Sequence, residues 1–260
     1  MTIERGEPQI AAASMPAMSR TLTIATRESR LALWQAGHVK ALLERKAVAG
    51  SFWWSALYQQ RPVPLGNTLF RKAWSGRYQH AHGIYALKRP GEAGARLFTD
   101  RQCVRFGTMD LAVSQKESAD FTVLSSWAMT PERDLILLDV DRRKLEAPDQ
   151  PGMMRKALSK WGLKFIGVES TAYQLSLVQY ARREGIPVKA LRADKDKVAR
   201  ALTASAYQEG GKLFLPEWAS WLDDFEEELY KFPSVKHDDQ TDTVSYAAIY
   251  AGNRAAQGSA

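Results

Sequence analysis

The order of apolar segments after residue 103 constrains the fold more than any other feature of the sequence. Three strand-like segments follow one another at 103–113, 121–127 and 135–140, separated by polar or turn residues. Short consecutive strands of this kind favour an antiparallel meander. Helix-like and strand-like segments then alternate as far as the C-terminal region. The sequence therefore predicts an α/β protein with a mixed sheet flanked by helices.

The alternating part can be divided into elements from its apolar periodicity and its helix stops. Gly185 and the pair Gly210-Gly211 end two of the helices. Helices are expected at 151–161, 172–184, 195–209 and 218–231 and from about 238, and strands at 164–168, 187–191 and 212–215. Three strands followed by this alternation is the order of an RNase H-like fold.

The first hundred residues are predicted to lie outside this domain. Residues 1–18 are expected to fray, residues 21–26 alternate as a short strand, and residues 28–46 have apolar positions near helical spacing that end before Gly50. The predicted organisation is a strand-helix appendage over 1–50, a linker or arm over 51–100, an RNase H-like domain over 101–253 and a tail over 254–260.

Composition and charge limit the class of protein. Hydrophobic residues make up 45% and charged residues 25% of the 260 residues, as in a soluble globular protein. No membrane span and no secretory signal is recognisable, so a cytoplasmic protein is expected. The single cysteine, Cys103, excludes an internal disulfide and a thiolate zinc cage, and we expect it to be a buried strand residue.

The formal charge of +7 suits a polyanionic partner, although basic residues often form solvated surface without a partner. Their distribution is more specific than their number. A short stretch contains Arg182, Arg183, Lys189, Arg192, Lys195, Lys197 and Arg200. This stretch is a candidate track for phosphates.

Acidic residues stand at the ends of three predicted elements. Asp110 lies in the first meander strand among apolar neighbours, and Glu169 ends a second strand that is predicted to be buried. The run His237-Asp-Asp-Gln-Thr-Asp begins the last helix, where Asp239 and Asp242 share a face at i and i+3. An N-cap needs only one of these acids, and Asp238 would suffice.

Three carboxylate positions at the ends of successive elements suit two Mg²⁺ or Mn²⁺ ions. Hard cations choose oxygen ligands, and two ions about 3.5 to 4 Å apart activate water and stabilise the leaving oxygen of a phosphodiester. From the residues alone, a structural role for each acid stays open.

Several segments resemble phage terminase large subunits, in the same order and over about 200 residues. Trp54-Ser-Ala-Leu-Tyr-Gln-Gln-Arg-Pro-Val-Pro, with Gly66 and Leu69-Phe70, resembles the segment that joins motor to nuclease. Met109-Asp-Leu-Ala with Lys116-Glu-Ser-Ala-Asp-Phe-Thr-Val resembles the first nuclease motif of that family, and Val168-Glu169 resembles the second. Asp196-Lys197-Val-Ala-Arg200-Ala resembles the basic helix that follows the second motif. His237-Asp-Asp-Gln-Thr-Asp242 with Ser245-Tyr246-Ala247 resembles the third motif.

The resemblance implies an RNase H-like nuclease domain over about residues 52–252. It implies a metal-dependent endonuclease that cleaves double-stranded phage or prophage DNA during packaging, in the cytoplasm of the host cell. A portal protein, a small terminase subunit and a separate ATPase are the further partners implied. The implied catalytic residues are Asp110, Glu169 and Asp239, the ligands of two Mg²⁺ or Mn²⁺ ions are these three with Asp238 and Asp242, and the DNA-binding residues are Lys116, Lys197 and Arg200.

Two features depart from that family. The phosphate-binding pattern G-x-x-x-x-G-K-[ST] occurs nowhere in the sequence, so ATP hydrolysis is not expected of this chain. Residues 18–44, beginning Met18-Ser-Arg-Thr-Leu-Thr-Ile-Ala-Thr-Arg, resemble the N-terminus of hydroxymethylbilane synthase (porphobilinogen deaminase), whose remaining fold is not found downstream. We interpret this piece as an inert fusion or an assembled reading frame.

Two alternative functions stay open beside the endonuclease. One is a catalytically silent terminase remnant that binds DNA or a packaging partner. The other is a fragment of tetrapyrrole biosynthesis, which would use the N-terminal piece. That piece is too small to form a core, so it should fray or dock on the nuclease domain through Leu31, Trp34, Val39 and Leu42.

Overall fold

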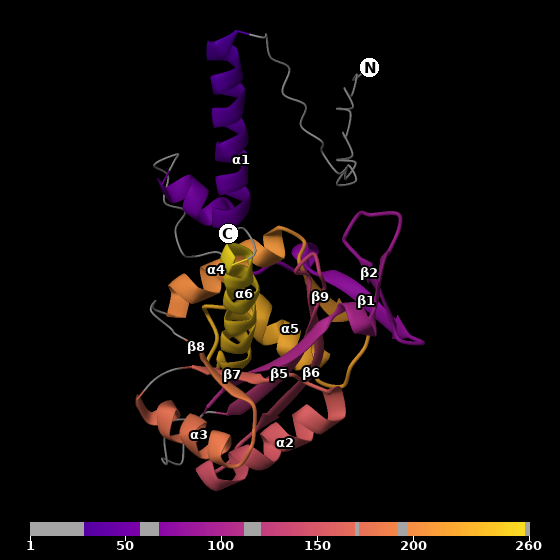
Figure 1. The fold of residues 1–260 in the computed structure, drawn as a ribbon, viewed down its shortest axis with the longest axis vertical. Coiled ribbons are helices and arrows are strands. Elements are labelled where there is room, and N and C mark those ends of the chain that lie inside the picture. The colour runs from indigo at the N-terminus through magenta and orange to yellow at the C-terminus, as the bar shows by residue number, and fades with distance from the viewer. Residues whose placement is uncertain (1–28, 58–67, 112–120, 170–171, 192–196, 258–260) are drawn as a thin grey trace, which may run out of the picture.

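A computed structural model of the chain describes residues 29–57, 68–111, 121–169, 172–191 and 197–257 (Figure 1). Its strands are β1 (Gly76–Ala81), β2 (Ile84–Lys88), β3 (Arg96–Thr99), β4 (Val104–Asp110), β5 (Thr122–Met129), β6 (Leu135–Arg143), β7 (Ile166–Glu169), β8 (Val188–Leu191) and β9 (Leu213–Pro216). Its α-helices are α1 (Arg30–Leu57), α2 (Gln150–Trp161), α3 (Ala172–Arg183), α4 (Lys197–Glu209), α5 (Leu222–Lys231) and α6 (Asp239–Gln257).

All nine strands form one mixed sheet in the order β3-β2-β1-β9-β6-β5-β4-β7-β8. Strands β4, β5 and β6 are consecutive and antiparallel, which confirms the predicted meander. Strands β7 and β8 extend it in parallel from β4, and β9 pairs in parallel with both β6 and β1. The fold is therefore α/β with a mixed sheet, as the sequence predicted.

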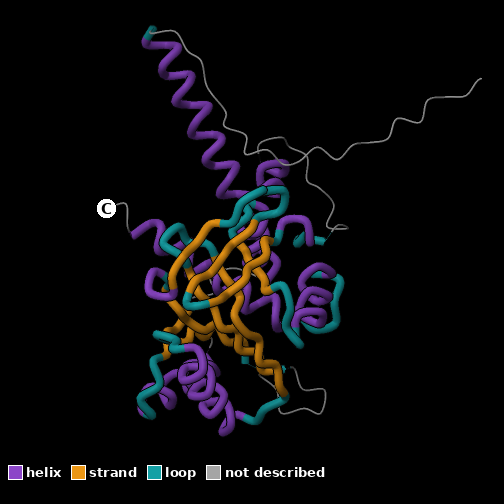
Figure 2. Tube along the Cα trace, turned by 90° about the vertical axis from the view of Figure 1, so that its right-hand side faces the viewer, coloured by secondary structure: helices purple, strands orange, loops and turns teal. Residues whose placement is uncertain are grey.

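Helices cover both faces of the sheet, α2 and α3 on one side and α4, α5 and α6 on the other (Figures 1 and 2). All eight residues of β5 are buried, because this strand lies near the centre and is covered on both faces. Strand β4 alternates: Phe106 packs with the α6 side and Met109 with the α2 and α3 side. This alternation decides which way Asp110 points.

Strands β1 to β3 lie in the stretch that was expected to be a linker or arm, and they belong to the same sheet as the rest. The pairing of β1 with β9 joins this small meander directly to the main sheet. Strands β1 and β2 are connected by His82 and Gly83, both at positive φ (51° and 75°), as a type I′ turn requires. Exposed polar residues in β1 hide its strand character from an apolar pattern.

Helix α1 is longer than predicted. It continues past Gly50 to Leu57, so the expected break at this glycine is wrong. A single glycine costs a helix only about 1 kcal/mol relative to alanine, which is too little to end it. The strand expected at 21–26 lies outside the described residues.

Three of the four residues of the predicted docking face of α1 are exposed, although α1 contacts α4. Leu31 and Trp34 are 65% and 66% exposed and Val39 is 42% exposed, while Leu42 is half-buried. The first turns of α1 extend away from the sheet (Figure 1). Across the described ranges, no helix is both long and apolar enough to cross a bilayer.

Candidate active site

The ends of two neighbouring parallel strands bring Asp110 and Glu169 together. Met109 of β4 pairs with Val168 of β7, so the two acids occupy the next position of each strand. Met109 and Val168 are buried in the core beneath α2 and α3. Because side chains alternate along a strand, Asp110 and Glu169 point to the opposite face, where α6 lies.

Helix α6 is fixed over this strand end by buried hydroxyl groups. The Thr108 hydroxyl of β4 donates to the backbone carbonyl of Thr243 (2.9 Å), and Ser125 of β5 contacts the Thr243 hydroxyl at 2.6 Å. The indole N–H of Trp127 in turn donates to Thr108 (2.8 Å). The acids in the first turn of α6 are thereby held beside Asp110.

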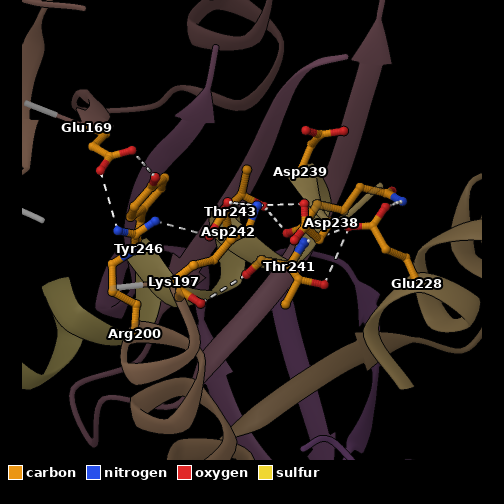
Figure 3. A network of polar contacts seen from close by, with 12 residues as sticks. Glu169, Lys197, Arg200, Glu228, Asp238, Asp239, Thr241, Asp242, Thr243 and Tyr246 are labelled. Carbon is orange, nitrogen blue, oxygen red and sulfur yellow. Dashed lines mark hydrogen bonds and ion pairs between the residues drawn. The ribbon is translucent and has the colours of Figure 1, made fainter. Parts of the chain in front are cut away.

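A carboxylate that the sequence reading missed caps the start of α6. Glu228, on α5, accepts hydrogen bonds from the Thr241 backbone N–H (2.9 Å) and the Gln240 side-chain amide (2.7 Å) (Figure 3). A negative charge at a helix N-terminus is favourable, because the first amides of the helix lack partners. The acidic run in α5 was the available signal, but which of its acids turns inward depends on tertiary packing.

Two basic side chains of α4 bridge the acids. The Lys197 ammonium lies 2.5 Å from Asp238 and 2.8 Å from Asp242. The Arg200 guanidinium lies 3.5 Å from Glu169 and 3.4 Å from Asp242. Figure 3 shows that these contacts join β7, α4 and α6 in one network. Asp242, more than Asp239, is thus the acid of α6 that shares a cation with Glu169.

Two contacts complete the surroundings of Glu169 and Asp239. Tyr246 of α6 donates its hydroxyl to the second oxygen of Glu169 (2.6 Å). Asp239 is buried, and its carboxylate lies 4.0 Å from the guanidinium of Arg142 at the end of β6. Arg142 also lies 3.8 Å from Glu228. The site is therefore ringed by residues from β4, β6, β7, α4, α5 and α6.

The family model of the terminase RNaseH-like domain matches residues 107–251, more than half of the chain. The chain belongs to this family. The predicted resemblance to terminase nuclease domains and the RNase H-like fold are confirmed by this match. The resemblance of residues 18–44 to hydroxymethylbilane synthase lies outside the matched range and stays a prediction.

Solved structures similar to this terminase RNaseH-like domain include nuclease domains of large terminases. The large terminase nuclease of thermophilic phage G20c, solved with bound magnesium, is 14% identical with a TM-score of 0.49, covering 72% of this chain and 98% of that one. The Thermus phage P74-26 nuclease domain is 15% identical with a TM-score of 0.46, covering 70% and 94%. No curated protein matches the sequence. The family assignment rests on the family model.

The acids of this terminase domain lie close enough for their charges to raise one another's pKa. Burial raises the pKa of Asp110 well above its usual range, and the nearby charges of Asp242, Asp239 and Glu169 raise it further. Burial also raises the pKa of Asp242, against the effect of Lys197. Carboxylates arranged in this way strongly favour a cation among them.

Lys197 and Arg200 of the terminase domain already neutralise part of this negative charge. Among the described residues, no three His, Cys, Asp or Glu side chains are grouped closely enough to hold a metal ion. Burial alone would lower the pKa of Lys197, but Asp242 and Asp238 raise it. The donor atoms are carboxylate oxygens, the type that hard cations choose, but the carboxylates would have to move closer together to share an ion. An ion ligated by Asp242 would have to displace Lys197 or Arg200.

The predicted phosphate track of the terminase domain is only partly formed by free basic side chains. Lys197 and Arg200 turn toward the acids, and Lys189 lies 4.0 Å above the ring of Phe165. Lys116 lies outside the described residues, as do Arg192 and Lys195. Cys103 is buried as predicted, but it lies immediately before β4 and not within the strand.

Proposed function

We propose that this terminase RNaseH-like domain is an endonuclease that cleaves double-stranded DNA with two Mg²⁺ or Mn²⁺ ions. The observation that carries the proposal is the position of Asp110. It is a buried carboxylate at the end of a central strand, within electrostatic reach of Glu169, Asp239 and Asp242. Such a cluster is tolerable when cations neutralise it, and phosphodiester hydrolysis is the chemistry that paired divalent ions serve best.

The proposed ligands of the ions are Asp110, Glu169 and Asp239, with Asp238 and Asp242 beside them. When bound, the ions would activate a water molecule and stabilise the leaving oxygen of the phosphodiester. Tyr246 would orient Glu169 through its hydroxyl hydrogen bond. Lys197 and Arg200, once exchanged from Asp242, would be placed to neutralise a DNA phosphate.

The setting proposed for this activity is DNA packaging in the cytoplasm of a host cell. A portal protein, a small terminase subunit and an ATPase on another chain are proposed partners. Residues 18–44 are proposed to take no part in the reaction, because one strand and one helix cannot build the site of the synthase that they resemble.

A catalytically silent DNA-binding remnant is the alternative, and one observation favours it. Lys197 and Arg200 already pair with three of the acids, so part of the negative charge of the site is neutralised without metal. A protein that has lost its reaction could keep such a site as a structural ion network. The two functions differ in whether metal ions can enter and support cleavage.

Nicking of a supercoiled plasmid in the presence of Mn²⁺ separates them. We expect the full chain to convert the plasmid to open circles, and Asp110→Asn to abolish conversion with little loss of thermal stability. Asp223→Asn is the matched control, because Asp223 is an exposed acid outside the cluster. Binding without nicking by the unmodified chain, at any Mn²⁺ concentration, would leave the silent remnant as the function.

A further inference from the structure

A groove of about 620 Å³ lies directly beside the acidic cluster, between β6, α2 and α5. Gln240, which follows Asp239 in α6, lines it. Arg142 lines it too and reaches Asp239 at 4.0 Å from the groove side. The groove therefore borders the candidate active site through Arg142 and Gln240.

The sheet itself opens this groove. Strand β9 pairs with β6 only at Leu135 and Ile136. From Asp139 onward, that edge of β6 has no partner among the described strands, and its residues line the groove instead. Helices α2 and α5, which lie on opposite faces of the sheet, both contribute side chains. The groove is thus a passage around the open edge rather than a closed cavity.

The lining contains both cationic and aromatic side chains. Four cations and two aromatic rings take part: Arg142, Arg143, Lys156, Lys160, Phe121 and Trp221. Cations in such a groove can contact the phosphates of a DNA backbone, and an aromatic ring can hold a cation in position through a cation–π contact.

Acids also line the groove, but two of the three are already ion-paired. Asp139 lies 2.6 Å from Lys160, and Asp141 lies 2.6 Å from Arg143. Asp224 is the third. Among the cations, Lys156 is exposed on α2, and Arg142 has only distant carboxylate contacts at 3.8 and 4.0 Å. These two cations have the most remaining capacity to bind phosphate.

Phe121 gives Arg142 a fixed position at the mouth of the groove. The Arg142 guanidinium lies 4.1 Å from the centre of the Phe121 ring, and the Lys144 ammonium lies 5.4 Å from the centre of the same ring. His237, next to the acidic run, packs edge-on against this ring at 5.6 Å. A ring that contacts two cations therefore keeps positive charge beside the acids.

We propose that the DNA backbone on one side of the cleaved phosphate runs through this groove, held by Arg142 at its mouth and Lys156 further along. The proposal rests on the proposed endonuclease function and assigns the path of its substrate. It places one flank of the DNA on the β6 side of the acids, opposite the α4 side that carries Lys197 and Arg200.

The test measures binding of a fluorescent duplex oligonucleotide to the full chain by anisotropy at several salt concentrations. Lys156→Glu should weaken binding and reduce the slope of log K against log salt by about 1, the value for one lost phosphate contact. Its plasmid-nicking KM should rise while kcat is retained. The matched control is Lys88→Glu, an exposed lysine on β2 that lies outside the groove.

Phe121→Leu is the second variant, because it keeps an apolar side chain but removes the ring beneath Arg142. It should also raise KM for nicking at an unchanged melting temperature. If Lys156→Glu behaves like Lys88→Glu while the unmodified chain binds and nicks DNA, the groove is not the path and only this inference fails. If the unmodified chain neither binds nor nicks DNA, the proposed function fails first.

Discussion

At the residue scale, the candidate site is defined by which charge lies next to which acid. Asp110 is visible in the sequence because a carboxylate interrupts an apolar strand, and the acidic run at 237–242 is visible because it exceeds what a helix cap needs. The partners of these acids could not be predicted. Whether Arg200 faces a phosphate or Glu169 depends on how α4 packs against α6, and no local pattern encodes that packing.

Replacing Lys197 is expected to have opposite effects on metal binding and on DNA binding. Its ammonium competes with divalent ions for Asp238 and Asp242, so Lys197→Gln should tighten Mn²⁺ binding to the free protein, by no more than about fivefold for a partly exposed pair. The same change should weaken DNA binding, because one phosphate partner is lost.

Calorimetric titration with Mn²⁺ and anisotropy with DNA measure the two effects separately. Lys231→Gln is the control, since Lys231 is also ion-paired, with Glu227, but on the exposed side of α5. Weaker binding of both ligands by Lys197→Gln would mean that Lys197 supports the fold of the site and does not compete with metal.

At the element scale, the sequence predicted the helices and strands from β4 to α6 within a few residues. Their apolar periodicity is clear because each element is buried on one face or on both. Strands β1 to β3 were missed because they are short, lie toward the edge of the sheet and expose polar residues. Helix α1 was predicted too short because the weak penalty of Gly50 was interpreted as a stop.

The start of α6 gives the prediction at this scale. Glu228→Ala removes a buried carboxylate from the first amides of the helix, leaving Thr241 N–H without that acceptor. A loss of about 1 to 3 kcal/mol in the free energy of unfolding is expected, which would lower the melting temperature by several degrees. Nicking should fall as well, since the acids of α6 lose their fixed position.

Glu228→Gln separates the two effects, because the amide retains an acceptor oxygen and the size of the side chain. It should recover most of the melting temperature. Glu227→Ala, one residue away on the exposed face, should leave both melting and nicking unchanged. A normal melting temperature for Glu228→Ala would show that the cap does not stabilise α6.

At the scale of the whole molecule, the sheet order places the acids. The meander supplies β4 at the centre, the crossover through α2 adds β7 in parallel beside it, and α6 returns across the face that both acids share. The sequence predicted the meander, the alternation of helices and strands that follows it, and the family. It could not predict the open edge of β6, because the extent of its pairing with β9 is a property of the assembled sheet.

The central claim is that the acids of β4, β7 and α6 hold two divalent ions. Anomalous diffraction from a crystal of the full chain soaked in Mn²⁺ tests it most directly. The account predicts two peaks about 3.5 to 4 Å apart, both within ligand distance of carboxylates that include Asp110, with Lys197 or Arg200 displaced from Asp242. The claim would be contradicted if Mn²⁺ bound at other sites of the crystal but neither peak appeared here, and Lys197 and Arg200 still bridged the acids.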